Sequence, residues 1–243
     1  SKELHKWCRE KNLLFSSSKA KQGNIKSEKA AREWRYSELT VTAEQLSIKT
    51  PEQPFHYVIT AHTGSDRAET LLLNLSRGTD LGGLSSLRSC RELSSNLLQG
   101  QLKLIRPLLN FTREETAEIC KELSLPIWLD PTNNNKSLSR NRVRHEVTPV
   151  LESLYPGSSL RIASLAKRLE SHKDDQENLA NLAIKSLSRE DLLCRKSLCK
   201  LSISARSTII NLWLKNHGGP TISASQLEEL SHKIDSKKPN GSL

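Results

Sequence analysis

The chain reads Ile-Thr-Ala-His-Thr-Gly-Ser-Asp-Arg-Ala-Glu-Thr-Leu-Leu-Leu-Asn-Leu-Ser-Arg-Gly-Thr-Asp-Leu-Gly-Gly-Leu from Ile59 to Leu84. An apolar strand ending at Ile59 runs into a polar turn, and the spacing then predicts a helix over 66–77 that ends at Gly78. Open α/β sheets bind ligands where polar side chains gather between a strand and the following helix. The stretch therefore predicts an α/β fold with a binding site at this junction.

Two carboxylates lie in the first turns of the predicted helix. At 100° per residue Asp66 and Glu69 share one face, with His62 leading onto it, while the opposite face is apolar. Such acids can simply stabilise the helix dipole, and Thr63-x-x-Asp66 fits a capping box. They can equally bind an amine or Mg²⁺, and His62 can act as a general acid or base or stabilise phosphate charge. We take His62, Asp66 and Glu69 as candidate catalytic residues and Asp66 as the candidate metal ligand.

The bulk composition narrows the function classes. The 243 residues include 37 basic and 27 acidic side chains, a formal net charge of +10, which suits either a polyanionic partner such as nucleic acid or simply a basic soluble protein. No apolar run approaches the roughly 18 residues that span a bilayer, and the start does not resemble a signal peptide. The five cysteines show no CxxC spacing and the histidines are scattered. We expect a cytoplasmic protein with reduced thiols, no membrane partner and no protein-built metal cluster.

Strand and helix patterns alternate along the first part of the chain, which predicts a parallel sheet with crossover helices. We expect a polar loop up to about residue 100 and a short buried segment at 127–129. A capping box, Thr112-x-x-Glu115, opens one of the helices. The expected regular elements are helix 24–46, strand 55–61, helix 66–77, strand 101–109 and a helix from 113 to about 125.

The pattern changes after Asp130, where a polar loop leads into a segment that is helical to the end. Helical stripes occur at 143–154, with a kink expected at Pro149, and at 162–169, 179–187, 209–213 and 225–234, the last with a cap at Ser225. We therefore expect two domains, an α/β domain over 1–140 and an all-α domain over 141–243.

Two groups of arginines stand out. Arg140, Arg142 and Arg144 fall within five residues beside an asparagine-rich loop, a pattern that suits phosphate binding but also an ordinary solvated helix start. Arg32 and Arg35 project together from the first long helix, for which an exposed surface pair is the simpler interpretation.

Four blocks together resemble the tRNA(Ile)-lysidine synthetase family of the PP-loop superfamily. They are Ala-Ala-Arg-Glu-Trp-Arg-Tyr (30–36), the 61–78 part of the stretch quoted above, Ile-Arg-Pro-Leu-Leu (105–109), and Asp-Pro-Thr-Asn with Arg-Asn-Arg-Val-Arg-His-Glu-Val-Thr-Pro-Val-Leu (130–151). Their order and spacing match the family over about 24–155, and the helical remainder resembles its first accessory domain. The resemblance implies an incomplete parallel-sheet PP-loop domain, adenine nucleotide hydrolase-like, followed by an all-α domain.

The resemblance also implies a reaction. ATP, with Mg²⁺, adenylates the wobble cytosine of the isoleucine tRNA with a CAU anticodon, and free L-lysine then displaces AMP to form lysidine. His62, Asp66 and Glu69 would line the catalytic pocket, the acids binding lysine ammonium groups or Mg²⁺. The arginines would contact the other substrates, Arg32 and Arg35 at ATP and Arg140, Arg142 and Arg144 near the tRNA. Whether the protein is a monomer or a homodimer is left open.

The chain departs from the family pattern in two places. Thr63-Gly64-Ser65 stands where a second histidine and an acid are common, and the ATP loop Ser-Gly-Gly-x-Asp-Ser does not occur. We therefore expect an internal piece of a longer synthetase that does not turn over ATP by itself. Two alternatives stay open: another PP-loop tRNA-modifying enzyme such as a thiolase, and a non-catalytic tRNA-binding module.

Overall fold

The computed structural model describes residues 2–20, 27–97, 100–128, 133, 135–190, 192–220 and 222–235. The chain divides into two compact units, Ser1–Glu170 and Ser171–Leu243, each of which is described by itself. The expected division at 140/141 therefore lies inside the first unit, because residues 141–170 pack with the elements that precede them. None of the helices within the described ranges combines the length and the apolar character needed to cross a membrane.

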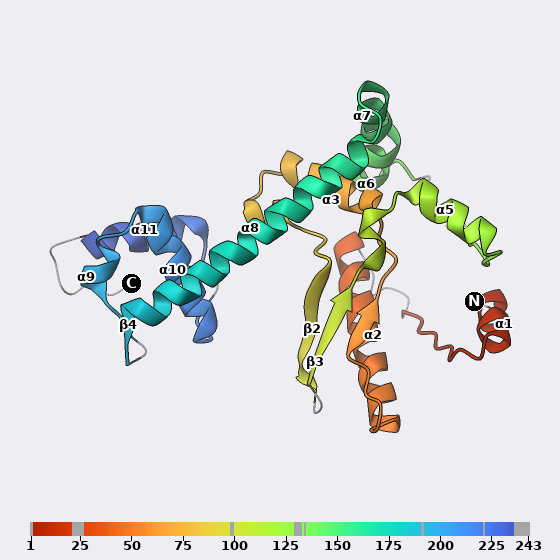
Figure 1. Cartoon of the computed structure of the whole chain (residues 1–243), viewed down its shortest axis with the longest axis horizontal. Helices are drawn as coiled ribbons and strands as arrows, with labels where there is room; N and C mark the ends of the chain where they lie inside the picture. Colours follow the sequence, from red (N-terminus) through yellow and green to blue (C-terminus); the bar gives the residue numbers. More distant parts are fainter. Residues whose placement is uncertain are drawn as a thin grey trace. The chain divides into compact units, whose positions relative to one another are not determined.

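The first unit is an α/β unit (Figure 1). Its elements, in chain order, are α1 (Lys2–Glu10), α2 (Glu28–Lys49), β1 (Tyr57–Ile59), α3 (Gly64–Ser76), α4 (Leu81–Leu84), β2 (Cys90–Leu97), β3 (Gly100–Ile105), the 3₁₀ helix η1 (Pro107–Asn110), α5 (Arg113–Glu122), α6 (Ser139–Arg142), the π-helix η3 (Val143–Val147), α7 (Thr148–Leu154) and the beginning of α8 (Ser158–Leu187).

A three-stranded sheet with the order β1-β3-β2 forms the centre of this unit. β1 and β3 are parallel, in the register Val58 opposite Leu104, and β2 is antiparallel to β3. Helix α2 lies along one face of the sheet (Figure 1), where Ala43 packs against Val58 and Leu104. The parallel β1–β3 pair, separated in sequence by α3, gives the crossover arrangement that the alternating pattern predicted.

Two local predictions in this unit were wrong. Residues 90–97, expected within a polar loop, form β2, because backbone pairing with β3 needs few apolar side chains; Leu93 packs against the core. The segment around Trp128, expected to be buried, is exposed: Ile127 is 59% and Trp128 82% accessible, and no described element covers them. Residue 129 lies outside the described residues.

Helix α3 needs a glycine at its first position. A Cβ on Gly64 would lie 2.8 Å from Leu160 Cδ2 of α8 and 3.0 Å from the Leu109 carbonyl oxygen. Gly64 N also donates to the Phe111 carbonyl oxygen over 2.7 Å. The start of α3 is therefore packed directly against both α8 and the chain that leads into α5.

The second unit is mainly helical, as expected. It contains the rest of α8, the short hairpin β4–β5 (Ser188–Arg189 and Leu192–Leu193), α9 (Arg195–Leu198), α10 (Ile203–Asn216) and α11 (Ala224–Asp235). Ala180, Leu198, Ile209 and Leu212 form its core.

Three helical details after residue 141 differ from expectation or refine it. The stripes at 162–169 and 179–187 belong to the single helix α8, because no glycine or proline interrupts the residues between them. Helix α11 is capped by Ser223, which exchanges hydrogen bonds with Gln226, and not by Ser225. Pro149 lies in the first turn of α7, directly after the π-helix η3, where its missing N–H is tolerated.

Candidate active site

The beginning of α3 is fixed by the capping box that the sequence predicted. Thr63 N donates to Asp66 Oδ2 over 2.8 Å, and Thr63 Oγ1 lies 3.0 Å from the same oxygen. Asp66 N completes the box by donating to Thr63 Oγ1 over 3.4 Å. One oxygen of Asp66 is therefore used in building the helix, which leaves Oδ1 for other partners.

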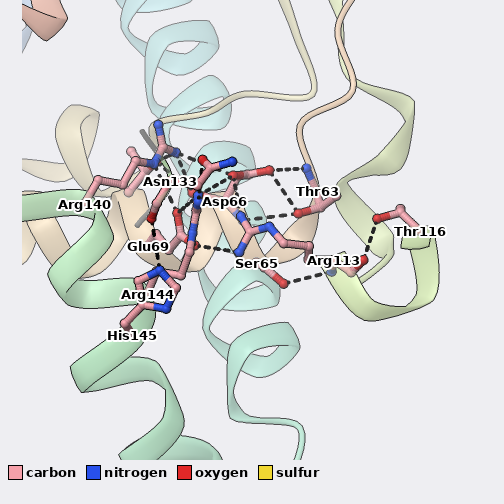
Figure 2. Close-up of polar contacts among 11 residues, drawn as sticks. Thr63, Ser65, Asp66, Glu69, Arg113, Thr116, Asn133, Arg140, Arg144 and His145 are labelled. Atoms are coloured by element: carbon pink, nitrogen blue, oxygen red, sulfur yellow. Dashed lines mark hydrogen bonds and ion pairs between the residues drawn. The ribbon is translucent and has the colours of Figure 1, made fainter. Parts of the chain in front are cut away.

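Three arginines from three separate elements converge on the two acids of α3 (Figure 2). Arg113, the first residue of α5, places Nη2 2.9 Å from Asp66 Oδ1 and Nη1 3.1 Å from Glu69 Oε1. Arg140 of α6 donates from Nε to Glu69 Oε2 over 3.1 Å. Arg144 of the π-helix donates to both oxygens of Glu69, over 2.8 Å and 3.1 Å. The acids thus join α3, α5 and the segment 140–144 into one site.

Glu69 is the buried centre of this network, with 1% of its surface exposed. Burial alone would raise the pKa of Glu69, but the hydrogen bond from Arg144 and the charges of Arg113 and Arg144 outweigh it and lower that pKa. The Arg144 pKa is raised in turn, chiefly by its hydrogen bond to Glu69. Glu69 is therefore ionised at neutral pH and its charge holds the arginines in place.

Asp66 is more accessible than Glu69, with 17% of its side chain exposed against 2%. Burial would raise the Asp66 pKa, but the backbone hydrogen bond from Thr63 and the charges of Arg113 and Arg140 lower it overall. An ionised carboxylate is thus available at the edge of the network.

A cavity of about 330 Å³ opens beside Asp66, and we call it the arginine cavity. Its described lining carries four arginines and one carboxylate, a balance that favours an anionic ligand rich in phosphate oxygens. The polar and charged side chains that matter here are Arg32, Arg35, His62, Asp66, Arg140 and Arg144.

His62 lies in the wall of the arginine cavity and is neutral at physiological pH. Burial and the charge of Arg106 lower the His62 pKa to about 4, although Asp66 acts in the opposite direction. Its Nδ1 lies 2.9 Å from Thr60 Oγ1, which fixes the ring orientation. Burial and the surrounding cations disfavour an imidazolium, so His62 is a weak base that stays neutral and can act as a hydrogen-bonding group in the cavity wall.

Tyr36 also lines the arginine cavity, and Arg106 is hydrogen-bonded to its hydroxyl group. Arg106 is 3% exposed and donates from Nη2 to the Tyr36 hydroxyl oxygen over 3.2 Å. The guanidinium groups of Arg91 and Arg32 lie 4.7 Å and 5.7 Å from the centre of the Tyr36 ring. Burial would raise the Tyr36 pKa, but the hydrogen bond and charge of Arg106 lower it. The ring therefore holds Arg32 at the cavity by a cation–π contact.

A second cavity, of about 470 Å³, lies on the other side of the acid–arginine network, and we call it the carboxylate cavity. Arg144 lines both cavities, whereas Asp66 lines only the first and Glu69 only the second. The charged residues of its lining are Glu69, Arg113, Glu114, Arg144 and Glu152. Hydrogen bonds from Ser159 and Gly157 lower the Glu152 pKa to about 2, so this side chain is ionised.

The structure brings most of the predicted site residues together. His62, Asp66, Arg32, Arg35, Arg140 and Arg144 share the arginine cavity, and Glu69 lies directly behind it. The two arginines of α2 are exposed, as predicted, and they also line this cavity.

Arg142 is the exception among the predicted residues. Its side chain is 65% exposed and pairs with Glu146 one helical turn later, away from the two acids. Of the Asp-Pro-Thr-Asn block only Asn133 is among the described residues, where its Oδ1 lies 3.4 Å from Arg144 Nη1. The remainder of that block lies outside them.

Sequence reasoning missed three residues of the site: Arg113, Tyr36 and Arg106. Arg113 could have been found, because it directly follows Thr112 of a predicted capping box and its position at the helix start is thereby fixed. Arg106 lies within the block 105–109, but nothing in one sequence shows that its guanidinium would reach Tyr36, 70 residues earlier.

The network offers Mg²⁺ no ready site. In the described ranges no group of three or more histidine, cysteine or acidic side chains lies close enough to hold a metal ion. Asp66 Oδ1 has guanidinium nitrogens of Arg113, Arg144 and Arg140 at 2.9, 3.6 and 4.0 Å, which repel a cation. In this arrangement the geometry disfavours the expected role of Asp66 as a metal ligand.

Comparisons with known proteins identify the family to which the chain belongs. Residues 1–151 match the family model of the PP-loop domain. A tRNA(Ile)-lysidine synthase of Prochlorococcus marinus is 44% identical over 243 residues, covering all of this chain and 71% of the relative. One from Parasynechococcus marenigrum is 42% identical, covering 99% of this chain and 68% of the relative. A chloroplastic one from Pyropia yezoensis is 33% identical, covering 85% of this chain and 60% of the relative.

Among solved structures, a U34-tRNA thiolase of Methanococcus maripaludis with its [4Fe-4S] cluster has a TM-score of 0.50 at 18% identity. The match covers 70% of this chain and 56% of the thiolase, and it supports the fold alone. The family model and the relatives at 42–44% identity show the family as well as the fold. The chain belongs to the tRNA(Ile)-lysidine synthase family of PP-loop enzymes.

Proposed function

We propose that the protein ligates lysine to the wobble cytidine of the isoleucine tRNA with a CAU anticodon, using ATP and forming lysidine. The observation that carries this proposal is the 44% identity along the whole chain to a relative with the name tRNA(Ile)-lysidine synthase. The two cavities are consistent with it, because a ligation of this kind must hold a nucleotide phosphate and an amino acid at the same time.

The arginine cavity suits the phosphates of the activated nucleotide. Arg32, Arg35, Arg140 and Arg144 present several N–H donors around one space, the arrangement that binds phosphate oxygens. Because Tyr36 holds Arg32 and Glu69 holds Arg140 and Arg144 before any ligand arrives, these three would need little rearrangement to stabilise negative charge that develops at the adenylated base.

The carboxylate cavity suits free lysine. Glu114 and Glu152 can accept hydrogen bonds from the ammonium groups, and Arg113 can pair with the carboxylate of the amino acid. This assignment changes the role of Glu69, which orders arginines, whereas Asp66, the more accessible of the two acids, lines the arginine cavity.

In the ligation step the lysine amine forms a bond to the ring carbon of the activated cytosine, and the bond from that carbon to the oxygen of AMP breaks. The amine loses its proton as the new bond forms. We assign that proton to water, because His62 lines the other cavity and its pKa of about 4 makes it a weak base. We route no step through Mg²⁺, because the acids described do not fit it.

The decisive experiment uses the protein expressed from its whole open reading frame, with CAU-anticodon tRNA, ATP and radiolabelled lysine. We expect incorporation into this tRNA and none into a transcript whose wobble cytidine is replaced by uridine. Asp66→Asn and Glu69→Gln should each reduce incorporation by at least tenfold, whereas Arg142→Ala, matched in chemistry but outside both cavities, should not. No incorporation by the unaltered protein would overturn the proposal, and unchanged incorporation by both acid variants would overturn the site.

A further inference from the structure

Three arginines lie around the ring of Tyr36, and we call Tyr36 together with Arg32, Arg91 and Arg106 the tyrosine cluster. The guanidinium groups of Arg91 and Arg32 lie 4.7 Å and 5.7 Å from the centre of the ring, and Arg106 Nη2 donates to the hydroxyl oxygen over 3.2 Å. Tyr36 and Arg32 belong to α2, Arg91 belongs to β2, and Arg106 directly follows β3. The cluster therefore joins the helix to the sheet within the first unit.

The tyrosine cluster carries three positive charges and no carboxylate. Among the residues that the structure describes, no acidic side chain forms an ion pair with Arg32, Arg91 or Arg106. Arg91 Nη1 donates to the backbone carbonyl oxygen of Glu92 over 3.4 Å, which is a neutral partner. A group of cations without a matching anion favours the binding of a negatively charged ligand.

The two acids next to the outer arginines in the sequence do not neutralise them. Glu33 pairs with Lys29, one turn earlier in α2, over 3.8 Å. Glu92 lies opposite Lys103 in the β2–β3 register, and successive residues of a strand point to opposite faces of a sheet. The side chains of Glu92 and Arg91 therefore belong to different faces, and the positive charge of the cluster stays unbalanced.

Tyr36 is fixed by the fold before any ligand arrives. Its ring packs against the core cluster that contains Val58 and Leu104, and its hydroxyl oxygen accepts from Arg106. Arg106 is only 3% exposed, so it adds charge and holds the ring but does not reach outward to a ligand. A fixed ring restricts the guanidinium groups that lie against it, and less conformational entropy is then lost when they bind.

The tyrosine cluster begins in the wall of the arginine cavity and continues outside it. Tyr36 and Arg32 line that cavity, whereas Arg91 is not among its lining residues. Arg32 is exposed on α2, and Arg91 is partly exposed on β2. Because both guanidinium groups lie against one ring, a surface that can bind anions extends from the arginine cavity to the sheet.

An extended surface of this kind suits RNA better than a free nucleotide. The phosphates of a free nucleotide stay in the space that binds it, whereas the backbone of a polymer continues past the reacting nucleotide and crosses the edge of the cavity. Arginines beside an aromatic ring are a common arrangement in proteins that bind single-stranded RNA. Arg91 lies outside the arginine cavity but against the same ring as Arg32, which is the placement that such a backbone requires.

We propose that Arg91 binds one backbone phosphate of the tRNA beside the wobble nucleotide, and that Tyr36 is the positioning residue for this contact. The inference rests on the proposed function, because it takes tRNA as the substrate and the arginine cavity as the place of the activated nucleotide. The phosphates of ATP have the same chemistry, so the experiment has to distinguish the two sources.

The test measures equilibrium binding of CAU-anticodon tRNA by the protein expressed from its whole open reading frame, across a series of salt concentrations and without ATP or lysine. We expect Arg91→Ala to weaken binding by about five- to tenfold and to reduce the slope of log K against log salt by about 1. Arg77→Ala is the matched control, since Arg77 is an exposed arginine of the same unit outside the tyrosine cluster and both cavities. It should leave both quantities close to the wild-type values.

Two substitutions of Tyr36 test its positioning role in the same binding assay. Tyr36→Phe keeps the ring and should leave the tRNA affinity within about twofold of the wild-type value. Tyr36→Leu removes the ring, and the loss in the double variant with Arg91→Ala should be clearly smaller than the two single losses combined. Losses that combine independently would show that Tyr36 does not act through Arg91 and would overturn its positioning role.

The KM for ATP in lysidine formation separates the two phosphate sources, and we expect Arg91→Ala to leave it unchanged. A raised KM for ATP with unchanged tRNA affinity would assign Arg91 to the free nucleotide and overturn the RNA contact. Equal losses of tRNA affinity in Arg91→Ala and Arg77→Ala would overturn it as well, since they would reflect net charge alone. Failure of the wild-type protein to bind tRNA would overturn the proposed function too, whereas wild-type tRNA affinity and lysidine formation in Arg91→Ala would overturn this inference alone.

Discussion

Arg144 forms a bidentate ion pair with Glu69, with Nε 2.8 Å from Oε1 and Nη2 3.1 Å from Oε2. The two residues are 75 positions apart in the sequence, and their contact closes the segment 140–144 over α3. Because Glu69 also holds Arg113 and Arg140, one buried carboxylate organises the polar groups of the whole site. The stability of the first unit and its chemistry consequently depend on the same side chain.

Replacing Glu69 should therefore be costly to folding. Glu69→Gln leaves three guanidinium groups without their shared carboxylate, and we expect it to lower the free energy of unfolding by about 3–5 kcal/mol. Urea denaturation followed by circular dichroism measures this. Glu146→Gln, which breaks the exposed pair with Arg142, should change it by less than about 0.5 kcal/mol. Similar effects of the two substitutions would contradict the central role of Glu69.

His62 should make the protein lose stability as the pH falls. The folded-state pKa of about 4 lies below the ordinary value of about 6.5, so the unfolded chain binds the proton first. Stability from this group is present above about pH 6.5 and is lost between about pH 6.5 and 4. Allowing for partial solvent screening, the loss is roughly 1–2 kcal/mol.

The variant His62→Gln isolates this contribution. The difference in unfolding free energy between the variant and the wild type should change between about pH 7.5 and 5.0, with the wild type losing more. A constant difference would show that His62 titrates normally. Below about pH 4.5 both proteins should lose further stability, because the lowered pKa values of Asp66 and Glu69 place their protonation in that range.

The arginines of the 140–144 segment should differ sharply in importance. Arg144→Ala removes a charge-assisted donor that lines both cavities, and we expect lysidine formation to fall by about 10- to 100-fold. Arg142→Ala should reduce it by less than about threefold, since that side chain points to solvent. Initial rates at saturating and limiting ATP provide the measurement, and equal losses would mean that Arg142 also reaches a substrate.

Gly64 should tolerate no side chain. The Cβ of Gly64→Ala would approach Leu160 at 2.8 Å and two backbone carbonyl oxygens at 3.0 and 3.1 Å, and we expect a loss of about 1–3 kcal/mol. Gly78→Asn is the control: its φ of +69° suits asparagine and no atom lies within 4 Å of its Cβ. Thermal unfolding compares them, and a stable Gly64→Ala protein would show that α8 can move away from α3.

Arg206 should anchor the second unit. It is 5% exposed and donates to the carbonyl oxygens of Leu201, Ser231 and Cys199 over 3.0, 3.1 and 2.8 Å. Arg206→Leu removes these bonds from buried carbonyl groups, at a cost of about 2–4 kcal/mol. Amide hydrogen exchange in α10 and α11 should accelerate, whereas the exposed substitution Lys215→Ala should leave it unchanged. Unaltered exchange in Arg206→Leu would contradict the anchoring role.

The sequence predicted best what short-range chemistry decides. The capping boxes at Thr63 and Thr112 and the end of α3 at Gly78 follow from side chains a few positions apart, and the structure confirms them. Strand β2 was missed because its stability comes from pairing with β3, which no local pattern of Cys90–Leu97 reveals. The exposure of Trp128 was missed for a related reason: whether an apolar segment is covered depends on elements elsewhere in the chain.

The candidate site likewise combines residues that the local sequence predicts with partners that only the tertiary fold brings to them. Asp66, Glu69 and His62 could be chosen from helical periodicity and the strand before it, and they lie together as expected. Their partners could not be assigned, because Arg113 and Arg144 reach Glu69 only through the tertiary fold. For that reason the acids were expected to bind a substrate cation or Mg²⁺, whereas in the structure Glu69 is already matched by cations of the protein itself.

Arg144 stands in the walls of both cavities, so a ligand that displaces its guanidinium from one cavity would also alter the other. A ligand in the arginine cavity that draws this guanidinium away from Glu69 changes the charge that the carboxylate cavity presents, and the reverse holds equally. Such linkage is reciprocal by necessity: the factor by which one ligand alters the affinity of the second equals the factor by which the second alters that of the first. A single side chain would then couple the affinities of two separate cavities.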